Sequence, residues 1–307
     1  MLSRTDSAWK LPDAFRSWLT ECNVFCGTLV DRIVTGYPKD EAGTLEKKCG
    51  YTGRLLVAGD PFALWVIECE NPGSVGKEFP LDKTSLPVIF KKNLRPYQER
   101  KVRLSNGAHT ASVFAAYLTE LTTVGEMMND KTMSAFFAES RIRRTCPNGS
   151  PAGGRVRQFA DSEMERSENH FIKHNLLSIA LNSISKYKAR MLPTILETQA
   201  KTGSLPKFLC FSLAAPMSFY SGELNSENKL IAVRGDIPYG ILDDTPELLF
   251  FVENNKQPAN EFTEAFLGRI DFWGRDLTQI PGLSKSVAGA LQSIRETGMA
   301  DAVRALL

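Results

Sequence analysis

Three residues near the middle of the chain carry side chains that could act on a carbonyl–alcohol pair. They are Lys101, Asn106 and His109, in the stretch RKVRLSNGAHTASVFAAYL. On one α-helix, at about 100° per residue, Asn106 lies roughly 140° and His109 roughly 80° from Lys101. The long lysine stem can swing toward both, so lysine could transfer a proton while amide and imidazole hold the oxygen. A solvated lysine, an asparagine near a helix start and a buried histidine are the alternative interpretation of this spacing.

A long helix is needed to position these three residues. Proline is accepted in a first helical turn, and apolar residues recur at helical spacing after Pro96, which predicts a helix over residues 96–121. The same periodicity predicts helices over residues 171–192 (ended by Pro193), 205–220, 246–253, 261–267 and 284–307. The chain after residue 90 is therefore expected to be mainly helical.

The first ninety residues show a mixed pattern. Residues 14–19 predict a short helix with Asp13 as its N-cap, and residues 28–34 and 62–67 predict strands. The charged, glycine-containing residues 39–53 between the strands predict an exposed connection. These elements indicate an α/β portion that is too small to be a complete doubly wound domain.

Composition and charge exclude several classes of protein. The 307 residues carry 37 Lys+Arg and 35 Asp+Glu, a formal net charge of +2, which gives no electrostatic argument for nucleic acid or an anionic membrane. No stretch approaches the roughly 18 apolar residues of a transmembrane helix, and the start lacks the apolar core of a secretory signal. Six cysteines are too few for a disulfide scaffold, and Cys22 and Cys26 lack companion metal ligands. We expect a cytoplasmic protein without a metal.

The stretch RKVRLSNGAHTA resembles the K-x4-N-x2-H signature of the long-chain polyol-specific dehydrogenases, the mannitol dehydrogenase family. The stretches NVFCGTLVDRIVTGYP, DPFALWVIE and HFIKHNLLSIALNSISKYKARMLP extend the resemblance over nearly the whole chain. They are most similar to the branch that interconverts D-tagaturonate and D-altronate with NAD(H) in hexuronate (galacturonate) breakdown. The resemblance implies an NAD-dependent oxidoreductase with a small-molecule sugar-acid substrate.

The family also implies a fold. Residues 1–90 resemble the C-terminal portion of a Rossmann domain, so an α/β remnant of that domain is expected there. Residues 91–307 resemble the mainly α-helical C-terminal substrate domain, which is 6-phosphogluconate-dehydrogenase-like.

The family pattern gives the three residues roles. The lysine that matches Lys101 is the general acid/base: it protonates the nascent alkoxide in reduction and takes the hydroxyl proton in oxidation. Asn106 and His109 match the residues that bind and orient the substrate oxygen.

Residues farther along the chain are candidates for binding the rest of the substrate. His174 and Lys186 are candidates for the hydroxyl groups or the carboxylate, and Lys188 and Arg190 are further options. A cationic pocket suits a carboxylate. The three cationic side chains are equally compatible with ordinary solvated charges.

Three features depart from the family. A GxGxxG turn, which receives the NAD pyrophosphate, occurs nowhere in the sequence, so we expect no proper NAD binding and no tagaturonate reduction by this chain alone. Gly27 stands where the family has an oxyanion-binding asparagine, and loss of one such donor costs about 10²–10³ in rate. Residues 139–158, with five arginines, replace an expected acidic helix, and we hypothesise a frameshift or coding error there.

The sequence is also compatible with other functions. The chain could be a non-catalytic relic or a sugar-acid-binding helical module of the same family, or a mannitol- or fructuronate-type polyol dehydrogenase. A Schiff-base aldolase would need a barrel with a buried lysine, and the long helices after residue 96 disfavour that fold. The sequence does not decide between NAD and NADP or give the oligomeric state.

Overall fold

A computed structural model describes residues 11–34, 36–142, 174–227 and 229–307. Within them the chain forms two compact units. The first holds the described residues up to 34 together with residues 59–99, and the second holds residues 35–58 together with residues 100–307.

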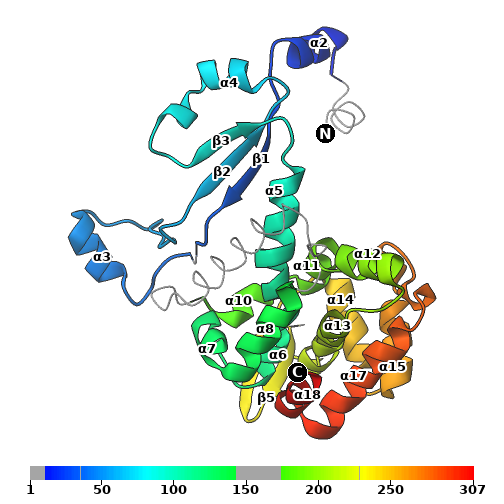
Figure 1. The fold of residues 1–307 in the computed structure, drawn as a ribbon. Helices are drawn as coiled ribbons and strands as arrows, with labels where there is room; N and C mark the ends of the chain where they lie inside the picture. Colours follow the sequence, from blue (N-terminus) through cyan, green and yellow to red (C-terminus); the bar gives the residue numbers. More distant parts are fainter. Residues whose placement is uncertain (1–10, 35, 143–173, 228) are drawn as a thin grey trace. The chain divides into compact units, whose positions relative to one another are not determined.

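The first unit is a small α/β structure around a three-stranded sheet of order β1-β2-β3 (Figure 1). Its elements are α2 (Asp13–Glu21), β1 (Gly27–Asp31), β2 (Leu64–Glu68), α4 (Pro72–Glu78), the 3₁₀-helix η1 (Leu81–Lys83), β3 (Val88–Lys91) and α5 (Arg95–Arg100). β1 is antiparallel to β2, whereas β2 and β3 are parallel and α4 lies in their connection. A parallel pair needs such a crossover. The expected α/β character of this part is confirmed.

The second unit is mainly helical, as expected, and its helices from residue 101 onward gather into one bundle in Figure 1. Its helices are α3 (Ala42–Cys49), the π-helix η2 (Lys101–Asn106), α6 (Gly107–Leu118), α7 (Val124–Asn129), α8 (Lys131–Ile142), α10 (Leu176–Ile179), α11 (Ser183–Arg190), α12 (Leu192–Thr202), α13 (Lys207–Phe219), α14 (Thr245–Asn254), α15 (Ala259–Leu267), α16 (Ile270–Trp273), the 3₁₀-helix η3 (Leu277–Gln279), α17 (Leu283–Thr297) and α18 (Met299–Leu306). Its strands are β4 (Gly222–Leu224), β5 (Leu230–Arg234) and β6 (Ile237–Ile241).

Helix α13 lies at the centre of this bundle because its sequence is apolar on every face. Eleven of its thirteen residues are buried, and it packs against both α6 and α17. A helix that is apolar all round is stable only when its whole surface is covered. The ring centroids of Phe114 on α6 and Phe219 on α13 are 4.6 Å apart. Burial of each such side chain contributes about 1.5–3 kcal/mol, so this core fixes α6, the helix that follows Asn106.

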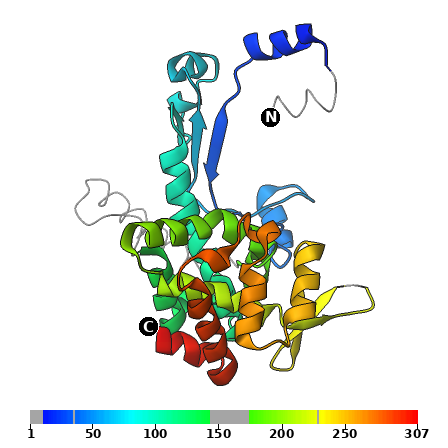
Figure 2. The ribbon, with the colours of Figure 1, turned by 90° about the vertical axis from the view of Figure 1, so that its right-hand side faces the viewer.

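A small antiparallel sheet of order β4-β5-β6 lies at the margin of the bundle in Figure 2 (yellow). Arg234 on β5 attaches it to α6, because its Nη1 donates to the carbonyl oxygens of Tyr117 (2.8 Å) and Leu121 (2.9 Å). Residues 222–241 are not predicted as strands from the sequence, since the runs are short and β6 contains Pro238 and Gly240.

Several helix predictions are confirmed. The helices predicted over residues 205–220, 246–253 and 261–267 correspond to α13, α14 and α15. The predicted strands over residues 28–34 and 62–67 correspond to β1 and β2, with shifted ends.

Other local predictions are wrong. Asp13 is the first residue of α2, and the N-cap position is Pro12. Residues 39–53 contain α3 and are more than a connection. The helix predicted over residues 284–307 is two helices, because Gly298 adopts a positive φ of 81° between α17 and α18.

The single helix predicted over residues 171–192 is also wrong. Residues 171–173 lie outside the described residues, and the rest forms α10, α11 and the start of α12. Asn182 interrupts the run with a left-handed backbone (φ 48°, ψ 47°). Pro193 does not end a helix but occupies the first turn of α12, where the missing N–H costs nothing.

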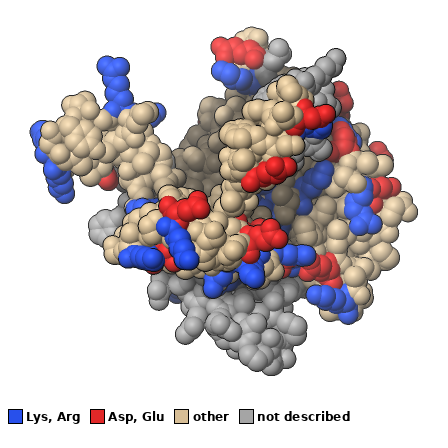
Figure 3. Space-filling view, turned by 90° about the horizontal axis from the view of Figure 1, so that it is seen from above, with Lys and Arg blue, Asp and Glu red and all other residues tan. Residues whose placement is uncertain are grey.

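The surface agrees with the balanced composition. In Figure 3, acidic and basic side chains are interspersed over the face that is shown. Among the described helices, none is both long enough and apolar enough to cross a membrane.

Candidate active site

The helix that carries the three candidate residues is not a uniform α-helix. Residues Lys101–Asn106 form a π-helix between α5 and α6, and the Gly107 N–H donates to the carbonyl oxygen of Val102, five residues earlier. π-Helical turns are rare and occur mostly as short insertions in α-helices, frequently at functional sites.

The π-helix changes the predicted arrangement of the candidate residues. An i→i+5 turn has about 4.4 residues, so each residue advances by roughly 82° and Asn106 lies only about 50° from Lys101. Three α-helical steps further, His109 returns to within about 10° of Lys101. The three half-buried side chains therefore fall in a sector of about 60° instead of the 140° expected for a regular helix.

Gly107 leaves room for the neighbouring helices at the end of the π-helix. A Cβ atom at this position would lie 2.5 Å from Met191 Sδ and 2.9 Å from the Val102 carbonyl oxygen. Met191 lies between α11 and α12. The missing side chain thus permits both the π-type hydrogen bond and the close approach of these helices.

The structure brings His109 and His174 together. Their ring centroids are 6.1 Å apart, and the His109 ring also contacts Phe137 on α8 at 5.1 Å. The His174 carbonyl oxygen accepts from Val124 N at 2.9 Å, which fixes the backbone there. Burial lowers the pKa of His174, so its imidazole is neutral at pH 7 and can both donate and accept a hydrogen bond.

Two cationic side chains of α11 lie one turn apart on one side of that helix. Lys186 Nζ donates to the Ile179 carbonyl oxygen (3.0 Å), and Arg190 Nη1 donates to Thr110 Oγ1 on α6 (3.0 Å). Burial, together with the charge of Arg190, lowers the pKa of Lys186, while the carboxylate of Asp243 acts in the opposite direction. Burial also lowers the pKa of Arg190. Two desolvated positive charges beside each other favour binding of an anion.

Lys188 does not join this pair. It lies two residues from each of the other two cations, which on an α-helix is the opposite side. Its Nζ is next to Gly274 at the end of α16, 3.3 Å from where a Cβ of Gly274 would be. The structure therefore separates Lys188 from Lys186 and Arg190.

Sequence analysis does not identify Tyr220 and Asp243, although the charge of Asp243 acts on Lys186 and Tyr220 contacts Asp243. Asp243 Oδ2 accepts from Tyr220 Oη (2.5 Å) and from the backbone N–H of Ser183 at the start of α11 (3.1 Å). Burial raises the pKa of Asp243, although the hydrogen bond from Tyr220 opposes the effect. No short motif joins residues so far apart, so only the fold could reveal them.

Asp243, Asp244 and Glu247 form a cluster of three carboxylates, with one oxygen from each lying within 4.8 Å of the others. The Asp244 N–H donates to Asp243 Oδ1 (2.9 Å), and Asp243 Oδ2 already accepts the two hydrogen bonds given above. Both oxygens of Asp243 thus serve the protein's own donors, and this arrangement gives no support for a metal site.

Gly27, where the family resemblance leads us to expect an asparagine, lies on β1 opposite Glu68 of β2. A Cβ at Gly27 would lie 2.9 Å from Glu68 Oε2, while Glu68 Oε1 accepts from the backbone N–H of Leu94 (2.8 Å). The Glu68 carboxylate therefore occupies the space that a side chain at position 27 would enter. Of the basic segment 139–158, only residues 139–142 are described, at the end of α8, and the frameshift hypothesis concerns residues outside the described part.

Two solved structures share the fold of this chain. The Pseudomonas fluorescens mannitol 2-dehydrogenase, in a ternary complex with NAD and D-mannitol, superimposes with a TM-score of 0.77 at 21% identity and covers 96% of this chain and 56% of its own. A substrate-free D-sorbitol dehydrogenase gives a TM-score of 0.67 at 17% identity, covering 96% of this chain and 57% of its own.

Sequence comparison shows the family. The model of the mannitol dehydrogenase C-terminal domain matches residues 93–295. Altronate oxidoreductases of Escherichia coli O7:K1 (strain IAI39 / ExPEC) and O1:K1 / APEC are each 41% identical to the chain over its whole length. The chain belongs to the mannitol dehydrogenase family, and it spans 62% of the length of these two relatives.

Proposed function

We propose that this chain is the substrate-binding part of an NAD-dependent oxidoreductase that interconverts D-tagaturonate and D-altronate in hexuronate catabolism. The names of the relatives at 41% identity support the reaction. The observation that carries the proposal is the pairing of the Lys101, Asn106 and His109 sector with the two half-buried cations of α11, one of which contacts α6 directly. The first group suits a carbonyl oxygen and the second suits a carboxylate.

The three residues on the helix handle the oxygen and its proton. NAD(H) supplies the hydride acceptor or donor when it is bound. In reduction, the Lys101 ammonium gives a proton to the oxygen that becomes the alcohol, while the Asn106 amide and the His109 imidazole donate hydrogen bonds to it. In oxidation the lysine amine takes the hydroxyl proton, so each direction restores the starting state for the other.

The other candidate residues bind and orient the substrate. Lys186 and Arg190 attract the carboxylate, and the neutral His174 beside His109 hydrogen-bonds a hydroxyl group. A neutral polyol would offer no charge to the two cations, which favours a sugar acid over mannitol. Of the described residues, we assign none to the nucleotide, and we expect its site in the part of the relatives that this chain does not match.

A second candidate function is a sugar-acid-binding module without catalysis. The observation in its favour is Gly27, where Glu68 fills the space of the family's oxyanion-binding asparagine. This module and the enzyme share the same substrate site. They differ in turnover: with a nucleotide site supplied, the enzyme reduces D-tagaturonate and the module does not.

Replacement of Lys186 by methionine should weaken binding of D-altronate by about 10–100-fold, because one charge-assisted hydrogen bond is worth about 1.5–3 kcal/mol. Isothermal titration of the 307-residue chain with D-altronate and with D-mannitol measures the effect. The matched control is Lys188→Met on the same helix, since Lys188 lies on the opposite side, next to Gly274.

We expect the unchanged chain to bind D-altronate more tightly than D-mannitol, and Lys188→Met to retain that preference. Equal losses of D-altronate affinity in Lys186→Met and Lys188→Met would show that binding depends on the total charge of α11 and not on the Lys186–Arg190 pair. Equal affinity for the acid and the neutral polyol in the unchanged chain would refute carboxylate recognition.

A further inference from the structure

The π-helix needs contacts that keep it from relaxing. Viewed along the helix axis, the Lys101 and Asn106 side chains are about 140° apart in an α-helix and about 50° apart in the π-helix. Relaxation of this turn would therefore rotate Lys101 by about 90° away from Asn106 and His109. The contacts that prevent this must come from residues outside the turn.

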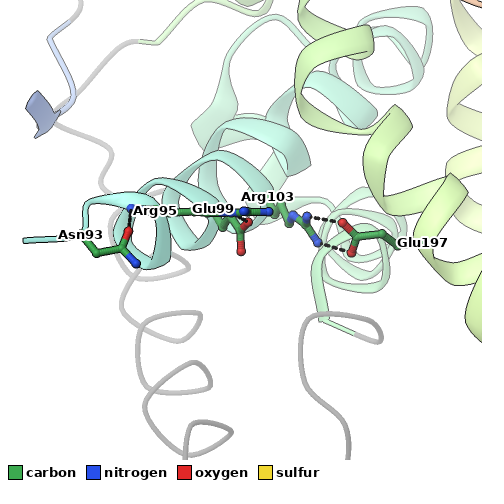
Figure 4. Close-up of polar contacts among 5 residues, drawn as sticks. All are labelled: Asn93, Arg95, Glu99, Arg103 and Glu197. Atoms are coloured by element: carbon green, nitrogen blue, oxygen red, sulfur yellow. Dashed lines mark hydrogen bonds and ion pairs between the residues drawn. The ribbon is translucent and has the colours of Figure 1, made fainter. Parts of the chain in front are cut away.

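The first such contact is an ion pair between the middle of the π-helix and α12. Arg103 Nη1 and Nη2 donate to the two carboxylate oxygens of Glu197 at 2.7 Å and 2.6 Å. Figure 4 shows the two parallel bonds, with the guanidinium facing the carboxylate. The Arg103 side chain is only 19% exposed. Two parallel hydrogen bonds fix the orientation of the Arg103 side chain as well as its distance from Glu197. They therefore hold the Arg103 side of the π-helix against α12.

Two further contacts hold the end of the π-helix. Met191 Sδ occupies the space beside Gly107, and Arg190 donates to Thr110 Oγ1, which in turn donates to the Asn106 carbonyl oxygen (2.9 Å). Arg190, Met191 and Glu197 all belong to the segment that joins α11 to α12 and the first turns of α12. One short segment thus contacts the π-helix at its middle and at its end.

We propose that Arg103 and Glu197 are positioning residues that hold the turn of Lys101–Asn106 in its π-helical form. In this role they act on the reaction by keeping Lys101 in the sector of Asn106 and His109. The structural part of this inference stands on the contacts above, and its consequence for catalysis rests on the proposed function.

Hydrogen exchange of the 307-residue chain tests the structural part. The reporter is the Gly107 amide, whose hydrogen bond to the Val102 carbonyl oxygen must break each time the turn leaves its π-helical form, which opens the amide to exchange. We expect Glu197→Gln to accelerate exchange of this amide about tenfold, while the buried amides later in α6, from Ala111 to Tyr117, keep their rates. Arg103→Lys keeps the positive charge but loses the second hydrogen bond to Glu197, so it should also accelerate exchange of the Gly107 amide.

The matched control is a second ion pair on the preceding helix, also drawn in Figure 4. Arg95 Nε donates to Glu99 Oε1 at 2.7 Å, but the Arg95 side chain is 80% exposed and the pair links residues one turn apart in α5. Glu99→Gln should leave the Gly107 amide unchanged. The double substitution Arg103→Glu with Glu197→Arg restores a pair of opposite charges and should recover the slow exchange of the Gly107 amide.

Two results would overturn the proposal. One is an acceleration in Glu197→Gln no larger than in Glu99→Gln, and the other is an acceleration spread evenly over α6, which marks general loss of stability. Reduction of D-tagaturonate by NADH separates the two levels, with the 307 residues joined to the part of an Escherichia coli altronate oxidoreductase that the chain does not match. A kcat about tenfold lower in Glu197→Gln than in Glu99→Gln, with unchanged binding of D-altronate, supports the catalytic consequence. If the unchanged chain does not bind D-altronate, the proposed function fails while the exchange result still decides the inference.

Discussion

Replacement of Lys101 by methionine should lower the rate of NADH-dependent D-tagaturonate reduction by about 10²–10⁴-fold, the usual contribution of a general acid. Methionine keeps most of the side-chain length but offers no proton to the forming alkoxide. The assay requires a nucleotide site, so we suggest joining the 307 residues to the part of an Escherichia coli altronate oxidoreductase that the chain does not match. Oxidation of NADH is followed by its absorbance.

The control for this substitution is Lys201→Met, an exposed lysine at the end of α12. It should leave both the rate and the affinity unchanged. Because Lys101 acts on the proton, its replacement should lower kcat much more than it weakens D-altronate binding. Retention of kcat within threefold in Lys101→Met would exclude Lys101 as the acid. Absence of turnover in the unsubstituted fusion, together with intact binding of D-altronate, would favour the non-catalytic module.

Replacement of Gly107 by alanine should destabilise the chain by about 1–3 kcal/mol, the cost of overpacking a tight contact. The new Cβ would lie 2.5 Å from Met191 Sδ and 2.9 Å from the Val102 carbonyl oxygen that accepts the π-type hydrogen bond. The flexible Met191 side chain can move aside, but the Val102 carbonyl group cannot move without disturbing the turn that positions Lys101. Urea unfolding measures the loss of stability, and D-altronate titration measures the effect on the site.

Gly289→Ala in α17 is the matched control, because nothing lies within 4 Å of a Cβ at that position. Alanine exceeds glycine in helix propensity by about 1 kcal/mol, so this variant should be at least as stable as the unchanged chain. The two substitutions are chemically identical and are expected to have effects of opposite sign. A Gly107→Ala variant that is as stable as Gly289→Ala and binds D-altronate normally would contradict the close contact at the π-helix.

The sequence was sufficient to predict the features that depend on local pattern. The apolar run of α13 and the periodicity of α14 and α15 identify these helices because core burial repeats with the helical period. The apolar periodicity after Pro96 likewise predicts a helical run through Lys101, Asn106 and His109, and the structure has one, with a π-helix at Lys101–Asn106.

The features that the sequence could not predict are set by distant contacts. The sequence analysis assumes 100° per residue throughout the helix and therefore does not predict the π-helix. The residues that contact this turn are Met191 and Glu197, and Glu197 follows Arg103 by 94 residues. The break at Asn182 depends on Asp243, which accepts from the N–H of Ser183 across 60 residues. The separation of Lys188 from Arg190 also depends on which neighbour covers each side of α11.

Binding of the sugar acid beside His109 and His174 is the central claim, and imidazole NMR of the 307-residue chain tests it most directly. The chain has three histidines, so its spectrum contains three imidazole Cε1–Hε1 signals, which His109→Gln and His174→Gln assign. On titration with D-altronate, we expect the His109 and His174 signals to shift together with one half-saturation concentration, since the two rings lie 6.1 Å apart. Saturable binding of D-altronate with both signals unmoved would place the substrate elsewhere and contradict the account.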